Sequence, residues 1–269
     1  METGQKKTIT IVSLVLVVSL GIVSFCGAFV QQTYEREVLS LAVQGMGQDI
    51  VNLFIVVPLL ILTLTGIHRE NKRSYFIFTG ILFYVVYSFF IYTLGIHFNA
   101  LFLLYCLTLG TSLYLFILMI IELSRMEVQN GFSHQASVKP VAVFFIILAA
   151  LFYALWLKDV VPAILKNTLP ESVRDYQILV NPVHVLDMSI VLPGLIITSL
   201  LLFKKHKYGF VFAPVFLVFI TVLAAALIGM AVMMKWKGIN EDISVGIIFV
   251  LISIFSLIFL IKFFRALRI

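Results

Sequence analysis

The sequence predicts an all-α integral membrane protein, a bundle of about eight transmembrane helices in one polytopic domain. Of its 269 residues, 62% are hydrophobic and only 12% are charged, far more apolar surface than a water-soluble core can bury. Apolar runs of about 18 residues or more recur along the chain, and this length matches the thickness of a bilayer. Most basic residues flank these runs. The membrane is therefore the first partner that the sequence indicates.

Eight runs are expected to span the membrane, and they cover residues 8–30, 50–67, 75–96, 98–121, 141–157, 183–203, 210–234 and 243–264. The first run is too long for a cleaved signal peptide and no small-residue cleavage site follows it, so we expect it to be retained. The polar segment 31–48 is expected outside the membrane. The fifth run is short and ends at Trp156, which is typical of an interfacial anchor.

The longest connection, residues 158–182, is expected to carry one short surface helix. Thr168 and Glu171 have the spacing of a capping box, which predicts a helix over residues 172–179.

The basic residues predict an orientation. Of the 19 Lys and Arg residues, 13 fall on the side of the eight-span arrangement that holds both termini. Positive residues collect in cytoplasmic loops, so both termini are expected in the cytoplasm, with the protein in the plasma membrane. The net charge of +6 is then explained by topology and by contact of basic loops with anionic lipid, and not by nucleic-acid binding.

Asp187 is the leading candidate for a functional residue. It lies within an apolar run, about 24 Å from the inner end of its helix at 1.5 Å per residue. No Lys or Arg lies in the middle of any run, so the carboxyl group must be protonated, hydrogen-bonded to Tyr or His, open to outer water, or bound to a cation. A purely structural hydrogen bond is the alternative. His184 precedes it by three residues and suits a proton relay or metal site, or simply orients Asp187.

Further polar residues are expected near the outer membrane face, as ligands for a bound solute or ion or as ordinary helix caps. They are Asp49, Asn52, His97, Asn99, Glu241 and Asp242. Tyr84 and Tyr87 share one face of the third span. They either line a cavity near these groups or pack against a neighbouring helix.

The chain also contains a candidate internal repeat, a parallel four-plus-four duplication. The segment from Asn52 to Pro58 aligns with that from Asp187 to Pro193, and the alignment continues if the basic turn differs by one residue. Both prolines lie about 14–15 Å from the inner ends of their helices, near the bilayer centre. Pro193 is followed by Gly194. Interrupted helices at matching positions point to a central binding site, and plain proline kinks are the alternative.

Three segments carry a resemblance: residues 48–58, the GIHFNALFLLY segment at 95–105, and NPVHVLD with its following LP at 181–193. They resemble a family of bacterial multi-pass membrane proteins of uncharacterised activity. The resemblance implies a bacterial source and an integral membrane location, and it implies no catalytic residue.

The function that these features favour is a small-solute or ion transporter with a polar site in the outer half of the bundle. The alternatives are an intramembrane metal-dependent enzyme using His184, Asp187 and His97, and a membrane sensor or assembly partner. No P-loop, GxSxG, HExxH or Rossmann glycine motif is present. The residues identify no cofactor, bound metal or oligomeric state.

The orientation is testable by cysteine labelling in intact cells. With a membrane-impermeant reagent, Ser172→Cys is expected to react from outside, whereas Lys205→Cys is expected to react only after the membrane is opened. Labelling of Lys205→Cys from outside would overturn the eight-span arrangement, because every later span would then be inverted.

Overall fold

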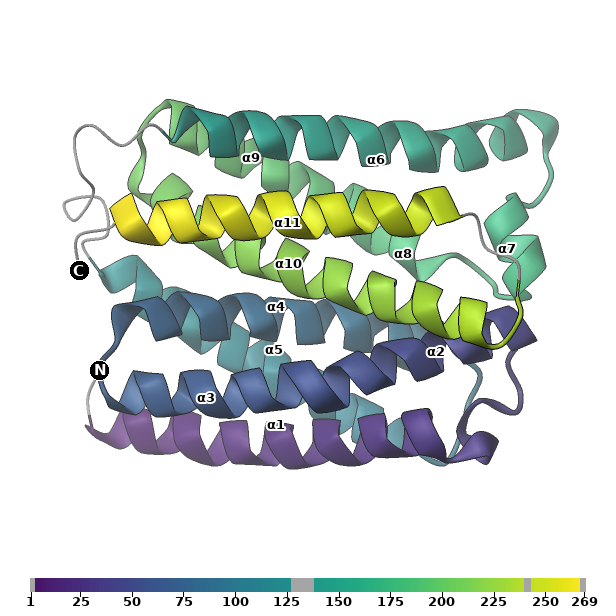
Figure 1. The fold of residues 1–269 in the computed structure, drawn as a ribbon, viewed down its shortest axis with the longest axis horizontal. Coiled ribbons are helices and arrows are strands. Elements are labelled where there is room, and N and C mark those ends of the chain that lie inside the picture. The colour runs from purple at the N-terminus through teal and green to yellow at the C-terminus, as the bar shows by residue number, and fades with distance from the viewer. Residues whose placement is uncertain (1–2, 127–137, 240–242, 267–269) are drawn as a thin grey trace.

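The computed structural model describes residues 3–126, 138–239 and 243–266, and all regular secondary structure in these ranges is helical (Figure 1). Eight of its helical segments are long and apolar enough to cross a membrane. They cover Gly4–Phe29, Leu39–His68, Lys72–Leu94, Phe102–Arg125, Lys139–Lys166, Pro182–Phe203, Lys207–Trp236 and Gly246–Ala266. The predicted all-α bundle of eight spans is confirmed.

The first half of the chain contains α1 (Thr3–Phe29), the 3₁₀ turn η1 (Gln31–Tyr34), α2 (Leu39–Val51), the π-helical turn η2 (Asn52–Val56), α3 (Val57–His68), α4 (Lys72–Leu94) and α5 (Phe102–Arg125). The second half contains α6 (Lys139–Lys166), α7 (Glu171–Tyr176), α8 (Pro182–Leu186), the π-helical turn η4 (Asp187–Val191), α9 (Leu192–Phe203), α10 (Lys207–Trp236) and α11 (Ile243–Ala266).

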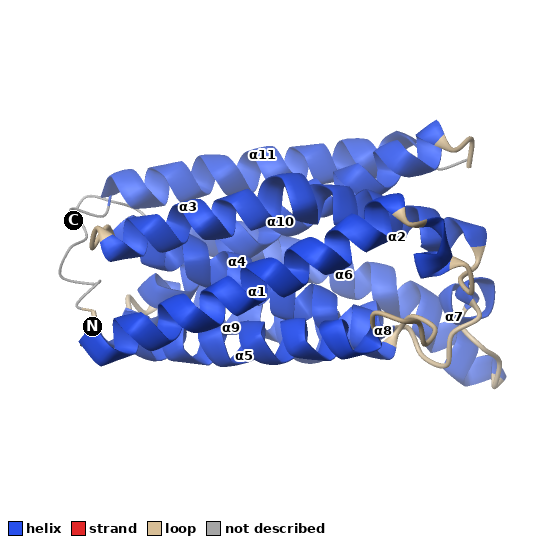
Figure 2. Cartoon of the chain, turned by 90° about the horizontal axis from the view of Figure 1, so that it is seen from below, coloured by secondary structure: helices blue, strands red, loops and turns tan. Residues whose placement is uncertain are grey.

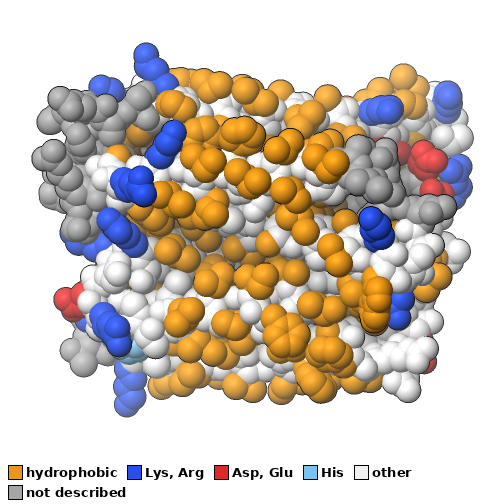
Figure 3. Space-filling view, viewed as in Figure 1, with side chains coloured by type: hydrophobic (Ala, Val, Ile, Leu, Met, Phe, Trp, Pro, Cys, Tyr) orange, Lys and Arg blue, Asp and Glu red, His pale blue; other side chains and the backbone are white. Residues whose placement is uncertain are grey.

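The helices lie side by side along one long axis, and both ends of the chain emerge at the same end of the bundle (Figures 1 and 2). We call this end the termini face and the other end, which carries η1 and α7, the opposite face. Apolar side chains cover the middle of the visible surface, and Lys and Arg gather toward its two ends (Figure 3). This distribution fits a protein surrounded by lipid tails along its length.

The second and fifth spans are much longer than the sequence predicted. The second helix begins at Leu39 and not at residue 50, because its polar residues Gln48 and Asp49 are buried against other helices and so escape a hydropathy criterion. The fifth helix was predicted as 141–157, but α6 continues to Lys166, past Lys158 and through Pro162. Hydropathy marks where a helix leaves the apolar layer, whereas the hydrogen-bonded helix itself continues beyond it.

The predicted capping box at Thr168 is wrong. α7 begins at Glu171, and its N-cap residue, Pro170, has no side-chain capping bond. Asp159 of α6, 12 residues before Glu171, takes this capping role. Its carboxylate accepts hydrogen bonds from the Glu171 N–H (3.0 Å) and from the Ser172 hydroxyl (2.7 Å). A carboxylate at a helix N-terminus also meets the positive end of the helix dipole.

At the termini face, an ion pair ties the start of α1 to the turn between α3 and α4. Lys6 Nζ lies 2.6 Å from Glu70 Oε1. The hydrogen bond and the positive charge of Lys6 lower the pKa of the Glu70 carboxyl. Thr10 Oγ1 and His68 Nε2, 3.0 Å apart, form a second link.

The two halves of the chain repeat the same elements in the same order, displaced by 135 residues, as from Asn52 to Asp187. The one-residue difference predicted for the basic turn is wrong. Glu70 and Lys205 both adopt left-handed backbone conformations, with φ of 58° and 51°. The next residues, Asn71 and His206, both cap the following helix through their side chains. The halves therefore stay in register through the turn.

A close contact between the two halves joins residues that are related by the same displacement of 135 residues. A Cβ atom on Gly80 of α4 would lie 2.8 Å from the carbonyl oxygen of Val215, which is its own counterpart on α10. The axis that relates the halves therefore passes between α4 and α10. Helices α4 and α10 start at the same end of the bundle, so this axis runs along the bundle as in a parallel repeat (Figure 1).

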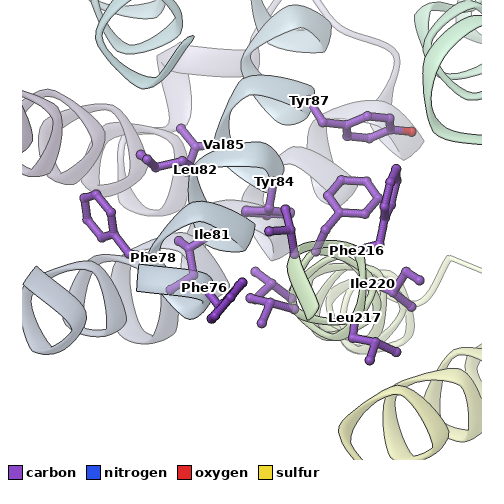
Figure 4. Packing of buried hydrophobic residues seen from close by; sticks show 14 of the residues in the cluster. Phe76, Phe78, Ile81, Leu82, Tyr84, Val85, Tyr87, Phe216, Leu217 and Ile220 are labelled. Atoms are coloured by element: carbon purple, nitrogen blue, oxygen red, sulfur yellow. The ribbon is translucent and has the colours of Figure 1, made fainter. Parts of the chain in front are cut away.

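A second pair of contacts confirms this symmetry. Gly47 of α2 packs on Met230 of α10, and Pro182 of α8 packs on Gly95 beyond the end of α4. The two contacts are counterparts under the same displacement. The core around the axis consists of aromatic and aliphatic side chains of α4 and α10 (Figure 4).

The close approach at Gly80 predicts a stability loss for Gly80→Ala. The added methyl group would lie 2.5 Å from Val218 Cβ, so we expect a loss of about 1–3 kcal/mol from overpacking, measured by thermal unfolding in detergent. Gly110→Ala is the matched control, because nothing lies within 4 Å of its added Cβ. Equal stability of the two variants would contradict this packing.

Candidate functional site

The two π-helical turns interrupt the second and sixth spans at equivalent positions. In each, an amide bonds to the carbonyl five residues back: Val57 N–H to the Asn52 carbonyl, and Leu192 N–H to the Asp187 carbonyl. Pro58 and Pro193 follow directly. Proline has no N–H, so the helix loses one backbone hydrogen bond at each turn. Single π turns of this kind are frequent at functional sites.

The carbonyl freed by Pro193 finds a partner on another helix. In the π register the next acceptor is the Met188 carbonyl, five residues before Pro193. It accepts a hydrogen bond of 3.2 Å from the Tyr153 hydroxyl of α6. Backbone polar groups in a bilayer must be satisfied within the protein, and α6 does this for η4.

Asp187, the first residue of η4, is held by two donors from two helices. Tyr87 of α4 donates to Oδ1 (3.0 Å) and the indole N–H of Trp156 donates to Oδ2 (2.9 Å). Only 7% of Asp187 is exposed. Trp156 therefore does more than anchor α6 at the interface. The ring of His184 lies 4.6 Å from the Trp156 ring and is also buried.

The first half of the chain contains a corresponding network around η2. Asp49 and Asn52 are fully buried, and Asn52 Nδ2 lies 3.5 Å from Asp49 Oδ1. Tyr34 of η1 donates to Asp49 Oδ2, and Tyr84 of α4 donates to Asn52 Oδ1 at 2.8 Å. Gln48 completes the network with a hydrogen bond of 3.4 Å to the Tyr84 hydroxyl.

The two networks occupy equivalent positions but differ in chemistry. Under the displacement of 135 residues, Asp49 corresponds to His184 and Asn52 to Asp187. Both pairs are three residues apart, buried, and placed at the start of a π turn. The duplication has thus given two buried polar pairs, and each places its one carboxylate at a different position.

His97 and Asn99 lie apart from both π turns, in the connection between α4 and α5. Glu37 accepts a hydrogen bond from the His97 backbone N–H (2.6 Å) and faces its ring nitrogen Nδ1 at 3.1 Å. Asn99 accepts from Leu101 N–H and donates to the Tyr105 hydroxyl, so it acts as a local cap.

Of the remaining predicted residues, Gly194 has a packing role and two acidic residues lie outside the described part of the chain. Gly194 lets α9 approach α10, since its added Cβ would lie 2.7 Å from the Phe216 ring. Glu241 and Asp242 lie outside the described residues. Within the ranges that are described, no three His, Cys, Asp or Glu side chains gather closely enough to hold a metal ion.

A cavity of about 230 Å³ lies between the halves, beside Asp187. Its walls are mostly apolar and come mainly from α2, α4, α6, α9, α10 and α11, with further residues from η1, α8 and η4. Its polar lining residues are Tyr34, Gln44, Gln48, Tyr87, Ser88, Tyr92, Trp156 and Asp187.

Ser88 and Tyr92 belong to the cavity wall, but their hydroxyl oxygens are fully buried and closed to the cavity. Tyr84 is the polar neighbour of the Ser88 hydroxyl, and Tyr34 and Asp49 are those of the Tyr92 hydroxyl. These hydroxyls therefore face polar groups of the protein, and Asp187 is the group in the wall that a ligand would meet.

The cavity exists because the second half of the bundle is more open than the first. In the first half α1 packs along α5, joined by a hydrogen bond of 2.9 Å from Thr108 to Ser19. In the second half, α6 and α11 meet through the rings of Phe144 and Phe259, 5.2 Å apart, toward the termini face. Farther along, both helices contribute side chains to the cavity wall.

The structure therefore brings Asp187, Tyr87 and His184 together on one side, and Asp49, Asn52 and Tyr84 on the other. Sequence reasoning missed Tyr34 and Trp156 as partners of these groups, and Tyr153 as the partner of the Met188 carbonyl. The helical spacing of Gln44, Gln48 and Asn52 is a signal that could have shown the early start of the second helix. The tyrosines and Trp156 carry no comparable signal, because their partners lie on other helices.

The hydrogen bond from Tyr153 to the Met188 carbonyl predicts that the stability effects of substitutions at Tyr153 and Pro193 depend on each other. Tyr153→Phe leaves the Met188 carbonyl without its partner and should cost about 1–2 kcal/mol of stability. In a Pro193→Ala background the same change should be nearly silent, because the N–H of the introduced alanine can donate to that carbonyl. Thermal unfolding of the four proteins gives the coupling.

Tyr114→Phe is the control, because Tyr114 is 68% exposed. Equal losses for Tyr153→Phe in both backgrounds would contradict the pairing of Tyr153 with the Met188 carbonyl.

Comparisons of the chain with models of protein families, with curated proteins and with solved structures find no match. The resemblance to a bacterial membrane protein family stays a prediction, and the functional argument depends on the geometry of this chain.

Proposed function

We propose that this multi-pass membrane protein is a small-solute transporter, with the cavity beside Asp187 as its binding site. The observation that carries the proposal is the cavity itself. It lies inside the bundle at the level of the interrupted sixth span, and it is lined by mostly apolar side chains and by the buried carboxylate of Asp187. Concave, mostly apolar sites with a few convergent polar groups are the usual form of a small-molecule site.

The symmetry of the fold supports the same conclusion. Many transporters are built from two repeats, with discontinuous helices near the interface between them. Here both π turns face the axis region between α4 and α10, because Tyr84 and Tyr87 of α4 bond to Asn52 and Asp187 respectively. A small rotation of one half against the other about this axis would change the access to a site that lies between them.

The proposal includes the orientation of the chain in the membrane. The termini face is assigned to the cytoplasm of a bacterial cell, because Arg69, Lys72, Arg73, Lys204 and Lys207 all lie in its turns or in the first helical residues after them. These residues would also contact the anionic lipid headgroups of the inner leaflet of the plasma membrane.

Access to the cavity from both sides of the membrane tests transport without knowledge of the substrate. In a background with Cys26→Ala and Cys106→Ala, the probe variant is Ala224→Cys, whose side chain lines the cavity. A small impermeant thiol reagent of the methanethiosulfonate type is expected to label it from either face of sealed vesicles. Ala226→Cys is the control, since Ala226 lies on the same helix, is fully buried and does not line the cavity.

Labelling of Ala224→Cys from one face only would contradict a transporter and favour a receptor or sensor with a one-sided site. No labelling from either face would remove the cavity from consideration as a solute path.

A further inference from the structure

We propose that the solute taken by this cavity is a small hydrophobic amine, bound as the ammonium ion. The inference rests on the proposed function only in taking the cavity as the binding site. It names the chemistry of the ligand, which is read from the charge, the aromatic rings and the volume of the site.

The charge of the lining calls for a cation. Asp187 is the one carboxylate among the described residues that line the cavity, and no Lys, Arg or His lies among them. Its two hydrogen-bond donors, Tyr87 and Trp156, are neutral. A carboxylate has about four acceptor positions, so at least two are open for a ligand. A buried carboxylate without a cation is costly, and an ammonium group in the cavity would remove this cost.

The walls of the cavity suit an organic cation better than a metal ion. Seven aromatic side chains line it: Tyr34, Tyr87, Tyr92, Phe152, Trp156, Phe219 and Phe249. Some of these rings contact one another, namely Tyr87 with Phe219 (5.5 Å, edge to face) and Phe152 with Trp156 (5.9 Å). Aromatic faces attract alkylammonium groups through their quadrupoles, and they also bury the apolar part of such a ligand.

The carboxylate oxygens of Asp187 favour an amine that carries N–H groups over a quaternary ammonium. An ammonium group with N–H donors can form charge-assisted hydrogen bonds with this carboxylate, whereas a quaternary ammonium has no N–H to donate.

The volume sets the size of the ligand. A protein cavity of about 150 Å³ is large enough for a benzene molecule. At about 230 Å³, this cavity has room for a six-membered ring with a short amine side chain. We therefore choose 2-phenylethylamine as the probe, and 2-phenylethanol as its neutral analogue with the same number of heavy atoms.

The experiment measures binding of the two probes to the full chain in lipid nanodiscs through Trp156 fluorescence. Trp236→Phe removes the other tryptophan, which is exposed and does not line the cavity. The amine is expected to bind at least about tenfold more tightly than the alcohol, because only the amine forms charge-assisted bonds with Asp187. Equal binding of the two probes, or no binding of the amine, would overturn the inference.

A variant pair tests the origin of the preference. Asp187→Asn keeps the shape of the side chain but loses its charge, so the amine and the alcohol should bind it with similar affinity. Asp175→Asn, an exposed carboxylate outside the cavity, should keep the full preference. An unchanged amine preference in Asp187→Asn would also overturn the inference. If that variant fails to fold, the comparison of the two probes on the unmodified cavity still decides the question.

The outcomes separate this inference from the proposed function. Amine binding combined with one-sided labelling of Ala224→Cys supports the amine site and rejects transport. Two-sided labelling combined with equal binding of amine and alcohol keeps transport and rejects the cationic ligand.

Discussion

The structure depends on one requirement of the bilayer: every backbone polar group within it must find a partner in the protein. Two prolines break this rule in the second and sixth spans, and the chain responds with a π turn before each. At η4 the Met188 carbonyl is satisfied by Tyr153 from α6. Trp156, one helical turn further along α6, reaches Asp187. The repair of one backbone defect thus positions the carboxylate.

The two halves show how a duplicated fold can hold different chemistry. The packing of α4 and its counterpart α10 about the axis is nearly the same in both halves, and so are the capped turns that precede these helices. Helix packing and backbone geometry fix these features. The polar pairs at the π turns differ. Asp49 is sealed by Tyr34 and Asn52, whereas Asp187 borders the cavity. The tight packing of α1 on α5, and its loss between α6 and α11, explains this difference.

The cavity combines apolar walls with a single charge. Such a site rejects anions through Asp187, and its apolar walls give a strongly hydrated ion few replacements for its water shell. The same features favour a ligand whose body is apolar and whose one end is cationic. The carboxylate of Asp187 adds direction, because hydrogen bonds to it would fix where the charged end lies.

The sequence by itself determined the eight spans, the place of Asp187 within the sixth span and the two proline interruptions, since hydropathy and residue spacing are local properties of the chain. It also paired Asn52 with Asp187 across the repeat. Only the tertiary structure decided where α2 starts, how far α6 extends, that π turns precede both prolines, and that Trp156 and Tyr153 serve η4. These features depend on contacts between helices. A polar residue that faces another helix is indistinguishable in sequence from one that faces water, because its partner lies many residues away.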